Sequence, residues 1–275
     1  MKNVISVFFL SEKEMDSYQI LREVGSGSYG RVYLAIDLRN NKQVAIKTIS
    51  LNDSSNREVD DLNQLAYPNC HPYVVCYLNS FIANNSLNIV TDYIEGPDVI
   101  NYVQPLRLVN QRQTLYECGR ILLKSMLLAL QYIHSKGIIH NDIKPGNIMV
   151  SKDRVPILID FGIACRNFPV CKEMMGTSLY LPPEAILTET RYYASDLWSL
   201  AATVYEVITG TNIWSLNTYL HTPTQLMEEV IRRFQQGSLP NRLVTNDAVM
   251  DGIVNNFLQY DPFQRMSVNQ ALSLL

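Results

Sequence analysis

Two polar loops, each bordered by a short apolar run, constrain this chain more than any other part of its sequence. The first loop, His140–Asn147, precedes the apolar run Ile148–Val150, and the second, Asp160–Gly162, follows Ile157–Ile159. Short apolar runs of this kind are typical of buried strands. Acidic and amide side chains placed beside such strands need a chemical reason, because loops on a rigid scaffold commonly carry function. The pattern therefore indicates a functional site.

The residue types in these loops indicate chemistry on phosphate groups. Magnesium prefers oxygen ligands and keeps several waters, so Asn147, Asp160 and substrate phosphates would suffice to hold it. A hydroxyl nucleophile needs one carboxylate to accept its proton, and Asp142 is the candidate. Lys144 can neutralise charge that builds on a transferred group. The alternative, a polar turn with unrelated charges, requires the spacing and both apolar flanks to coincide by chance.

A glycine-rich segment, Gly25–Val32, lies near the N-terminus. A dinucleotide-binding fingerprint would need a helix after the glycines, but the residues that follow, Val32–Ala35, read as a strand. Glycines let a backbone lie close over phosphates without a side-chain clash. A plain hairpin with a flexible turn remains the alternative for this segment.

Lys47 ends an otherwise apolar strand pattern, where a lysine would ordinarily be an exposed edge residue. We expect it to face phosphates, and a buried ammonium then needs a carboxylate partner. Glu58 on the next helix is the candidate, although Ser55 and Glu58 also fit a helix-start capping box. Asp60 and Asp61 are the neighbours that a different helix register would select.

The chain organisation predicts a small β-rich lobe and a larger helical lobe, in the α+β class. The expected strands are Tyr18–Val24, Arg31–Asp37, Gln43–Ile49 and Leu87–Thr91. The expected helices are Ser54–Ala66, Tyr116–Ser135 with Gly137 as its cap, and Asp196–Thr209 closed by Gly210. We expect an N-terminal tail over residues 1–17 and one domain over 18–275, divided into an N-lobe (18–91), a connector (92–97) and a C-lobe (98–275). A ligand site is expected between the lobes.

The composition excludes several classes of protein. A formal net charge of −3 lacks the basic excess of a nucleic-acid binder. The apolar run Val4–Leu10 is far shorter than a membrane span and has no cleavage signal after it. Five cysteines form no CxxC pair, so we expect reduced thiols, no disulfide framework and a cytoplasmic location; they are Cys70, Cys76, Cys118, Cys165 and Cys171.

Taken together, the motifs resemble those of the eukaryotic-type serine/threonine protein kinases over about residues 18 to 275. Further parts of the match are Gly176-Thr177, Pro182-Pro183-Glu184, Asp196-Leu197-Trp198 and Arg265. The resemblance implies a bilobal fold, ATP and Mg²⁺ as cofactors, and transfer of the γ-phosphate to serine or threonine hydroxyls of proteins. It also implies that Glu184 pairs with Arg265 and that Asp196 anchors the catalytic loop. The compact chain is similar to virus- or protist-encoded members.

The same resemblance implies a role for each candidate site residue. The expected catalytic residues are Lys47, Glu58, Asp142, Lys144, Asn147 and Thr177. The expected metal ligands are Asn147 and Asp160. The expected nucleotide-binding residues are Gly25, Ser26, Gly27, Gly30, Val32, Ala45, Lys47, Asp92, Ile94, Asp98, Met149 and Asp160. Asp98 also fits an ordinary aspartate at a helix start.

The chain departs from the family in its catalytic loop and in the segment that follows the Asp-Phe-Gly triplet. Asn141 replaces the arginine that commonly clamps a phosphate on that segment. The residues from Ile163 to Met175 include no serine, threonine or tyrosine. We therefore expect activity without phosphorylation of this segment, or control by a partner protein. Gly146 stands where basophilic members carry glutamate, so no preference for basic substrates is expected.

Three competing functions are weighed against this interpretation. A tyrosine kinase would ordinarily carry other residues in place of Lys144 and Thr177. A pseudokinase would lack Lys47, Asp142 or Asp160, and all three are present. A small-molecule kinase would lack the platform from Gly176 to Glu184. We expect a monomer that acts on protein substrates, without nucleic-acid or membrane partners. The chain stops soon after Arg265, which leaves little room for a regulatory extension.

Overall fold

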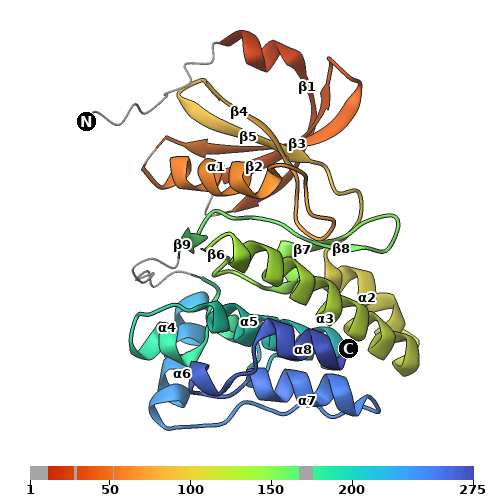
Figure 1. Ribbon diagram of the computed structural model, residues 1–275, viewed down its shortest axis with the longest axis vertical. Helices are drawn as coiled ribbons and strands as arrows, with labels where there is room; N and C mark the ends of the chain where they lie inside the picture. Colours follow the sequence, from red (N-terminus) through yellow and green to blue (C-terminus); the bar gives the residue numbers. More distant parts are fainter. Residues whose placement is uncertain (1–11, 28–29, 52, 167–175) are drawn as a thin grey trace. The chain divides into compact units, whose positions relative to one another are not determined.

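The computed structural model describes residues 12–27, 30–51, 53–166 and 176–275. The chain divides into two compact units, each with its own internal contacts. The N-terminal unit comprises Met1–His71 and Val75–Ile94, and the C-terminal unit comprises Pro72–Val74 and Glu95–Leu275. The first is rich in strands and the second is mainly helical (Figure 1).

The N-terminal unit is built on a five-stranded antiparallel sheet with the order β1-β2-β3-β5-β4. Its elements are η1 (Glu12–Ser17), β1 (Tyr18–Gly27), β2 (Gly30–Asp37), β3 (Lys42–Ser50), α1 (Asp53–Ala66), β4 (Tyr77–Ala83) and β5 (Ser86–Asp92). Each strand is joined to its neighbour in the chain by a short turn except where α1 intervenes between β3 and β4 (Figure 1). Successive side chains of a strand point to opposite faces. One face of the sheet can therefore be buried in a core, while the alternate side chains of each strand point to the opposite face.

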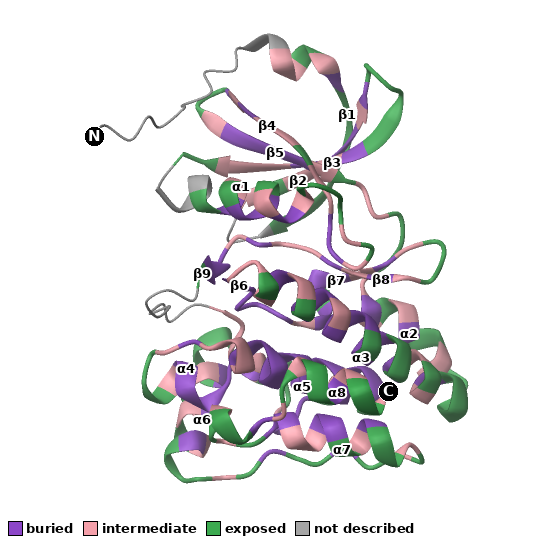
Figure 2. Ribbon diagram, in the orientation of Figure 1, coloured by how far each residue is buried: buried purple, intermediate pink, exposed green. Residues whose placement is uncertain are grey.

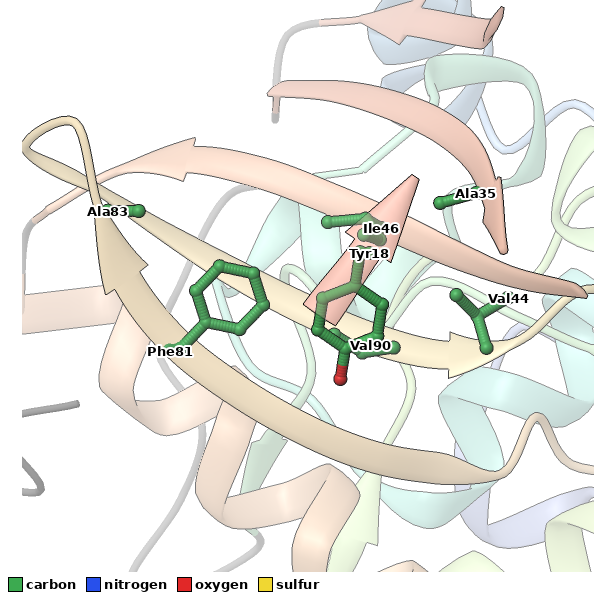
Figure 3. Close-up of a cluster of buried hydrophobic side chains, with 7 residues drawn as sticks. All are labelled: Tyr18, Ala35, Val44, Ile46, Phe81, Ala83 and Val90. Atoms are coloured by element: carbon green, nitrogen blue, oxygen red, sulfur yellow. The ribbon is translucent and has the colours of Figure 1, made fainter. Parts of the chain in front are cut away.

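One face of this sheet carries a core cluster of seven buried residues (Figure 3): Tyr18, Ala35, Val44, Ile46, Phe81, Ala83 and Val90. The rings of Tyr18 and Phe81 stack with their centroids 5.5 Å apart. Met15 of η1 packs against the cluster. Full burial of a side chain such as Phe81 contributes about 1.5–3 kcal/mol, so this face fixes the register of β3.

The C-terminal unit is organised around the helices α3 (Arg112–Ser135) and α5 (Tyr193–Thr209). Its other elements are α2 (Val99–Leu108), β6 (Ile138–Ile139), η2 (Pro145–Asn147), β7 (Ile148–Val150), β8 (Pro156–Leu158), β9 (Cys165–Arg166), η3 (Ser178–Tyr180), α4 (Pro183–Leu187), α6 (Pro223–Gln235), α7 (Ala248–Phe257), η4 (Pro262–Gln264) and α8 (Val268–Leu274). Two small sheets pair β6 with β9 and β7 with β8. These pairs position the polar loops of the sequence.

The α5 helix is buried on nearly every side (Figure 2). A helix that is apolar all round lies in a core, and Trp198 and Leu200 of α5 have no exposed surface. Gly119 of α3 lets the two helices approach closely, because a Cβ at this position would lie 2.7 Å from Ile208 Cδ1. Gly210 ends α5 in the left-handed conformation with φ of 79°.

The predicted fold class, a β-rich unit with one long helix and a mainly helical unit, is confirmed. The expected strands and helices are all present, with ends that differ by a few residues, and α3 begins earlier than predicted, at Arg112. The strand β4 and the helices after α5 were not predicted. No helix among the described residues is long and apolar enough to cross a membrane.

The prediction of reduced thiols was wrong for Cys70, Cys76 and Cys165, which are disulfide-bonded. The structure joins Cys70 and Cys76 in a disulfide, with their Cα atoms 5.4 Å apart. The two residues lie between α1 and the start of β4, where the chain folds back on itself. The spacing of cysteines in a sequence does not report such a return of the backbone, which is why the pair was missed. Among the described residues, Cys118 is a free thiol.

Candidate active site

In the N-terminal unit, β3 and α1 bring a lysine and a glutamate together. Lys47 Nζ lies 2.7 Å from Glu58 Oε1. Lys47 follows the core residue Ile46 in β3, so alternation directs it to the opposite face of the sheet. The side chains are 15% and 5% exposed, and a mostly buried ammonium is stabilised by such a partner. Glu58, the acid expected for this role, is thus at hydrogen-bonding distance from Lys47; the side chain of Ser55 lies outside the described residues.

The glycine-rich segment forms the end of the β1–β2 hairpin. Gly25 pairs with Val32, Ser26 with Arg31 and Gly27 with Gly30, and residues 28 and 29 lie outside the described part. Gly30 has φ of 124°, and a Cβ there would lie 2.3 Å from Thr48 O. Only glycine fits both conditions. The hairpin thus needs Gly30 for its own geometry, whatever its tip binds.

The remaining candidate residues of the N-terminal unit lie along the same sheet. Val32 is the register partner of Lys47, and Ala45 is that of Thr91. Asp92 ends β5, and its backbone N–H donates to Cys76 O at 3.0 Å. Ile94 is the last residue of this unit. Val32 and Ala45 thus supply apolar side chains on β2 and β3 beside Lys47.

In the C-terminal unit, three side chains converge on the carboxylate of Asp142. Thr177 Oγ1 donates to Asp142 Oδ1 at 2.9 Å, and Lys144 Nζ donates to Oδ2 at 2.6 Å. Lys144 Nζ also donates to Thr177 Oγ1 at 2.8 Å. Asn147 Nδ2 donates to Asp142 Oδ2 at 2.9 Å and to its backbone O at 2.8 Å. The carboxylate, which is 5% exposed, is therefore held in one orientation.

Asn147 and Asp160 are brought together by the backbone. Ile159 N donates to Asn147 O at 2.9 Å, which places the residue after Ile159 beside Asn147. Asp160 has φ of 63°, and its Oδ1 accepts a hydrogen bond from Gly162 N at 3.2 Å. Because Asn147 Nδ2 donates to Asp142, the Oδ1 atom of Asn147 is the one that could act as a metal ligand. A carboxylate and an amide oxygen fit Mg²⁺, which takes its other ligands from water and phosphate.

Asp196 at the start of α5 holds the catalytic loop by its backbone. His140 N donates to Asp196 Oδ2 at 2.9 Å, and Asn141 N donates to Oδ1 at 3.0 Å. His134 Nε2 lies 2.8 Å from Oδ2. Burial alone would raise the pKa of Asp196, but the hydrogen bonds from His134 and from the His140 backbone, with the electrostatic effect of both histidines, outweigh it, so the pKa lies below its ordinary value. The ionised carboxylate is thus the form that the fold stabilises.

A second buried acid, Glu184, pairs with Arg265. Arg265 donates from Nη1 to Glu184 Oε1 and from Nη2 to Oε2, both at 2.8 Å. The side chains are 0% and 5% exposed. Ser195 Oγ donates to Glu184 Oε1 at 2.7 Å. This fork ties the region after Thr177 to the C-terminal end of the chain.

The structure places Asp98 at the start of α2, as its N-cap. Asp98 Oδ1 accepts from Asn101 N at 2.8 Å and Oδ2 accepts from Asn101 Nδ2 at 2.7 Å. The helix-start interpretation therefore has direct contacts to support it, while contact with a ribose stays a prediction. Met149 in β7 forms a backbone bridge with Asp98, so the two residues are adjacent.

Sequence reasoning missed two residues at this site. His134, in the last turn of α3, received no role, although it contacts Asp196. Arg191 is 1% exposed; burial lowers its pKa, and the charges of Asp196, Glu184 and Asp142 act in the opposite direction. No local pattern in the sequence marks either residue. A buried arginine is expected only among acids, and that environment exists only once the chain has folded.

The sequence matches the family described as the protein kinase domain, over residues 18–274. The chain belongs to this family. It is 32% identical to the MAP3K epsilon protein kinase 2 of Arabidopsis thaliana over 216 residues, which are 76% of this chain and 16% of that protein. It is 28% identical to the serine/threonine-protein kinase Nek5 of Homo sapiens over 271 residues, which are 94% of this chain and 36% of that protein. The kinase-domain chain thus spans well under two thirds of the length of these relatives.

Proposed function

We propose that this protein kinase domain transfers the γ-phosphate of Mg-ATP to serine or threonine hydroxyls of proteins. The observation that carries the proposal is the convergence of Thr177, Lys144 and Asn147 on the carboxylate of Asp142. Catalysis of phosphoryl transfer rests almost entirely on positioning and electrostatic stabilisation. An acid held by three side chains has the orientation that such a reaction needs.

In this proposal, Asp142 orients the substrate hydroxyl and accepts its proton. The two hydrogen bonds that Thr177 and Lys144 make to it fix the carboxylate plane, so little reorganisation is needed when the proton moves. Lys144, whose side chain is 26% exposed, can turn from Asp142 toward negative charge on the transferred group. The chain supplies no covalent step of its own.

Asn147 and Asp160 are proposed to hold the magnesium ion, whose bound form would neutralise charge on the phosphates. Lys47, kept in place by Glu58, would bind the α- and β-phosphates. The backbone of the glycine-rich hairpin would cover the phosphates, and apolar side chains would face the adenine. The proposed nucleotide contacts are Gly25, Ser26, Gly27, Gly30, Val32, Ala45, Asp92, Ile94, Asp98 and Met149.

Specificity for serine and threonine is supported by two residues. Lys144 and Thr177 bond each other as well as Asp142, which is the arrangement the family uses for aliphatic hydroxyls. The names of the relatives Nek5 and dst1, both serine/threonine-protein kinases, agree with this assignment. A pseudokinase is disfavoured because Lys47, Asp142 and Asp160 are all present.

We further propose one catalytic domain over residues 18–275, with an N-lobe to residue 91 and a connector over 92–97. We propose a cytoplasmic location and a monomer. The Cys70–Cys76 disulfide weighs against this location. Titration of thiols in protein taken from its native source, without added oxidant, decides the point.

The test of the proposed function is transfer of labelled phosphate from Mg-ATP to casein, histone or myelin basic protein. We expect Asp142→Asn to lower kcat by about 10²–10⁴-fold, the usual contribution of a general base. Asp153→Asn is the matched control, because Asp153 is an exposed aspartate in the β7–β8 turn. Binding of Mg-ADP, measured by calorimetry, should persist in both variants. Unchanged transfer in Asp142→Asn, or none in the wild type, contradicts the proposal.

A further inference from the structure

Asn141 stands between His140 and the proposed catalytic base Asp142, yet its side chain has no part in the proposed reaction. It is 6% exposed and has φ of 68°. Asparagine tolerates this left-handed backbone better than most residues do. Its backbone N–H is bound by Asp196, so the position of the loop does not depend on the side chain. The amide is therefore available for another task.

The amide of Asn141 contacts the start of the segment that follows the Asp-Phe-Gly triplet. Asn141 Nδ2 donates to Ile163 O at 3.0 Å and lies 3.0 Å from Cys165 Sγ. The backbone pairing of β6 with β9 continues this contact, because Ile139 is the register partner of Cys165. The first stem of the segment, residues 163–165, is thus joined to the catalytic loop by side-chain and backbone bonds.

The backbone carbonyl of the same residue faces the other stem of the segment. A Cβ built on Gly176 would lie 3.1 Å from Asn141 O, and Gly176 has φ of 124°. This close approach allows only glycine at position 176. The next residue, Thr177, donates to Asp142. Both stems of the segment therefore meet at Asn141, one at its side chain and one at its carbonyl.

The chemistry of this junction is neutral. An amide that donates to a carbonyl needs no counter-charge, whereas a phosphate clamp needs a cation and a modified hydroxyl. The sequence from Ile163 to Met175 contains no hydroxyl side chain that could carry a phosphate. Among the described residues, the first stem is held by the Asn141 amide and by the backbone pairing of β6 with β9, and Cys165 is in addition disulfide-bonded.

We propose that Asn141 is a positioning residue that ties the first stem of the 163–177 segment, residues 163–165, to the catalytic loop beside Gly176 and so supports Thr177 on Asp142 without phosphorylation. The proposal rests on the proposed kinase function for its catalytic consequence. Its structural part, the tie itself, stands on the contacts of Asn141 alone.

The test compares the wild type with Asn141→Gly and Asn141→Asp. Glycine accepts a positive φ without strain and deletes the amide, while aspartate keeps the shape and removes the N–H donors. We expect kcat to fall about tenfold or more in both variants, with the KM for ATP unchanged, because Thr177 is then held less firmly on Asp142 while Asp196 still binds the loop backbone and nucleotide binding is unaffected. Asn110→Gly is the matched control, since Asn110 has φ of 54° and is exposed at the end of α2.

Hydrogen exchange supplies a readout that does not need activity. Amides of residues 164–166 and 177 should exchange faster in both Asn141 variants, while α3 and α5 keep their protection. Phosphatase treatment of the wild type should leave kcat unchanged. Wild-type exchange at both stems in both variants, or loss of activity on phosphatase treatment, overturns the proposal. An inactive wild type would refute the kinase function alone, because the exchange experiment still tests the tie.

Discussion

Replacing Arg265 by methionine should destabilise the C-terminal unit strongly, because the substitution leaves a buried carboxylate without its partner. The Arg265 guanidinium makes five hydrogen bonds, two to Glu184 and one each to the carbonyls of Gln259, Tyr260 and Ala194. In the variant, Glu184 loses both hydrogen bonds from Arg265 and keeps the one that the Ser195 hydroxyl donates to it. Methionine preserves most of the apolar stem, so the loss measures the charge and its hydrogen bonds.

The expected magnitude follows from burial. Breaking a buried ion pair on one side costs about 3–5 kcal/mol. Domains are stable by about 5–15 kcal/mol in total, so the variant should lose a large share of its stability. Arg232 provides the matched control, because it forms the same two-pronged contact with Glu229 at 2.8 and 2.7 Å. The Arg232 side chain is 53% exposed, so Arg232→Met should cost less than about 1 kcal/mol.

Urea unfolding followed by tryptophan fluorescence measures the loss of stability in the C-terminal unit, which contains Arg265. The chain has two tryptophans, Trp198 and Trp214, and both lie in the C-terminal unit. The midpoint should fall markedly for Arg265→Met and barely for Arg232→Met, with a similar dependence on urea. If Arg265→Met does not fold, Arg265→Lys, which keeps the charge and loses the fork, takes its place. Equal losses at the two arginines would refute the argument from burial.

Two further predictions concern the β1–β2 hairpin and one surface carboxylate. Gly30→Ala should lower stability by about 1–3 kcal/mol in thermal unfolding, because the φ of 124° and the contact with Thr48 O are both unfavourable; Gly25→Ala, where no atom lies within 4 Å, is the control and should change little. Hydrogen bonds from Arg232 and Arg233 lower the pKa of Glu229 to about 2 from an ordinary value of 4.5. A lowered carboxyl pKa stabilises the fold above the unfolded value, so the small advantage of wild type over Glu229→Gln should be constant above about pH 4.5 and shrink as the pH falls toward 2; a gap that widens on acidification would contradict the assignment.

Apart from the Glu184–Arg265 pair and the Asp196 contacts, which the family resemblance implied, the contacts that could be predicted from the sequence are those that local periodicity determines. Alternation in β3 separates Ile46 from Lys47, and helix spacing then selects Glu58 as the acid that α1 offers. The Asp142 loop was recognisable for a similar reason, since its residues lie close together in the chain. In each case the short sequence separation limits the geometries that the backbone can adopt.

The contacts that could not be predicted join segments far apart in the chain. His134 and Asp196 are 62 residues apart in the chain, and the fold brings them to 2.8 Å. The contacts of the Asn141 amide could not be predicted for the same reason. Its partners are the carbonyl of Ile163 and the sulfur of Cys165, which lie more than twenty positions further along the chain. The sequence showed only that an arginine was missing. What the asparagine does in its place depends on the pairing of β6 with β9.

In the loop that contains Asp142, backbone groups fix the position of the loop, while the side chain at position 141 makes a different contact. Asp196 binds the loop through backbone N–H groups of residues 140 and 141, which every residue except proline possesses. The side chain at position 141 can therefore change without moving the base. An arginine there could pair with a phosphate, whereas the Asn141 amide donates to the backbone carbonyl of Ile163. Under the proposal made for Asn141, the residue at position 141 would therefore determine whether the same scaffold needs a phosphate to hold Thr177 on Asp142.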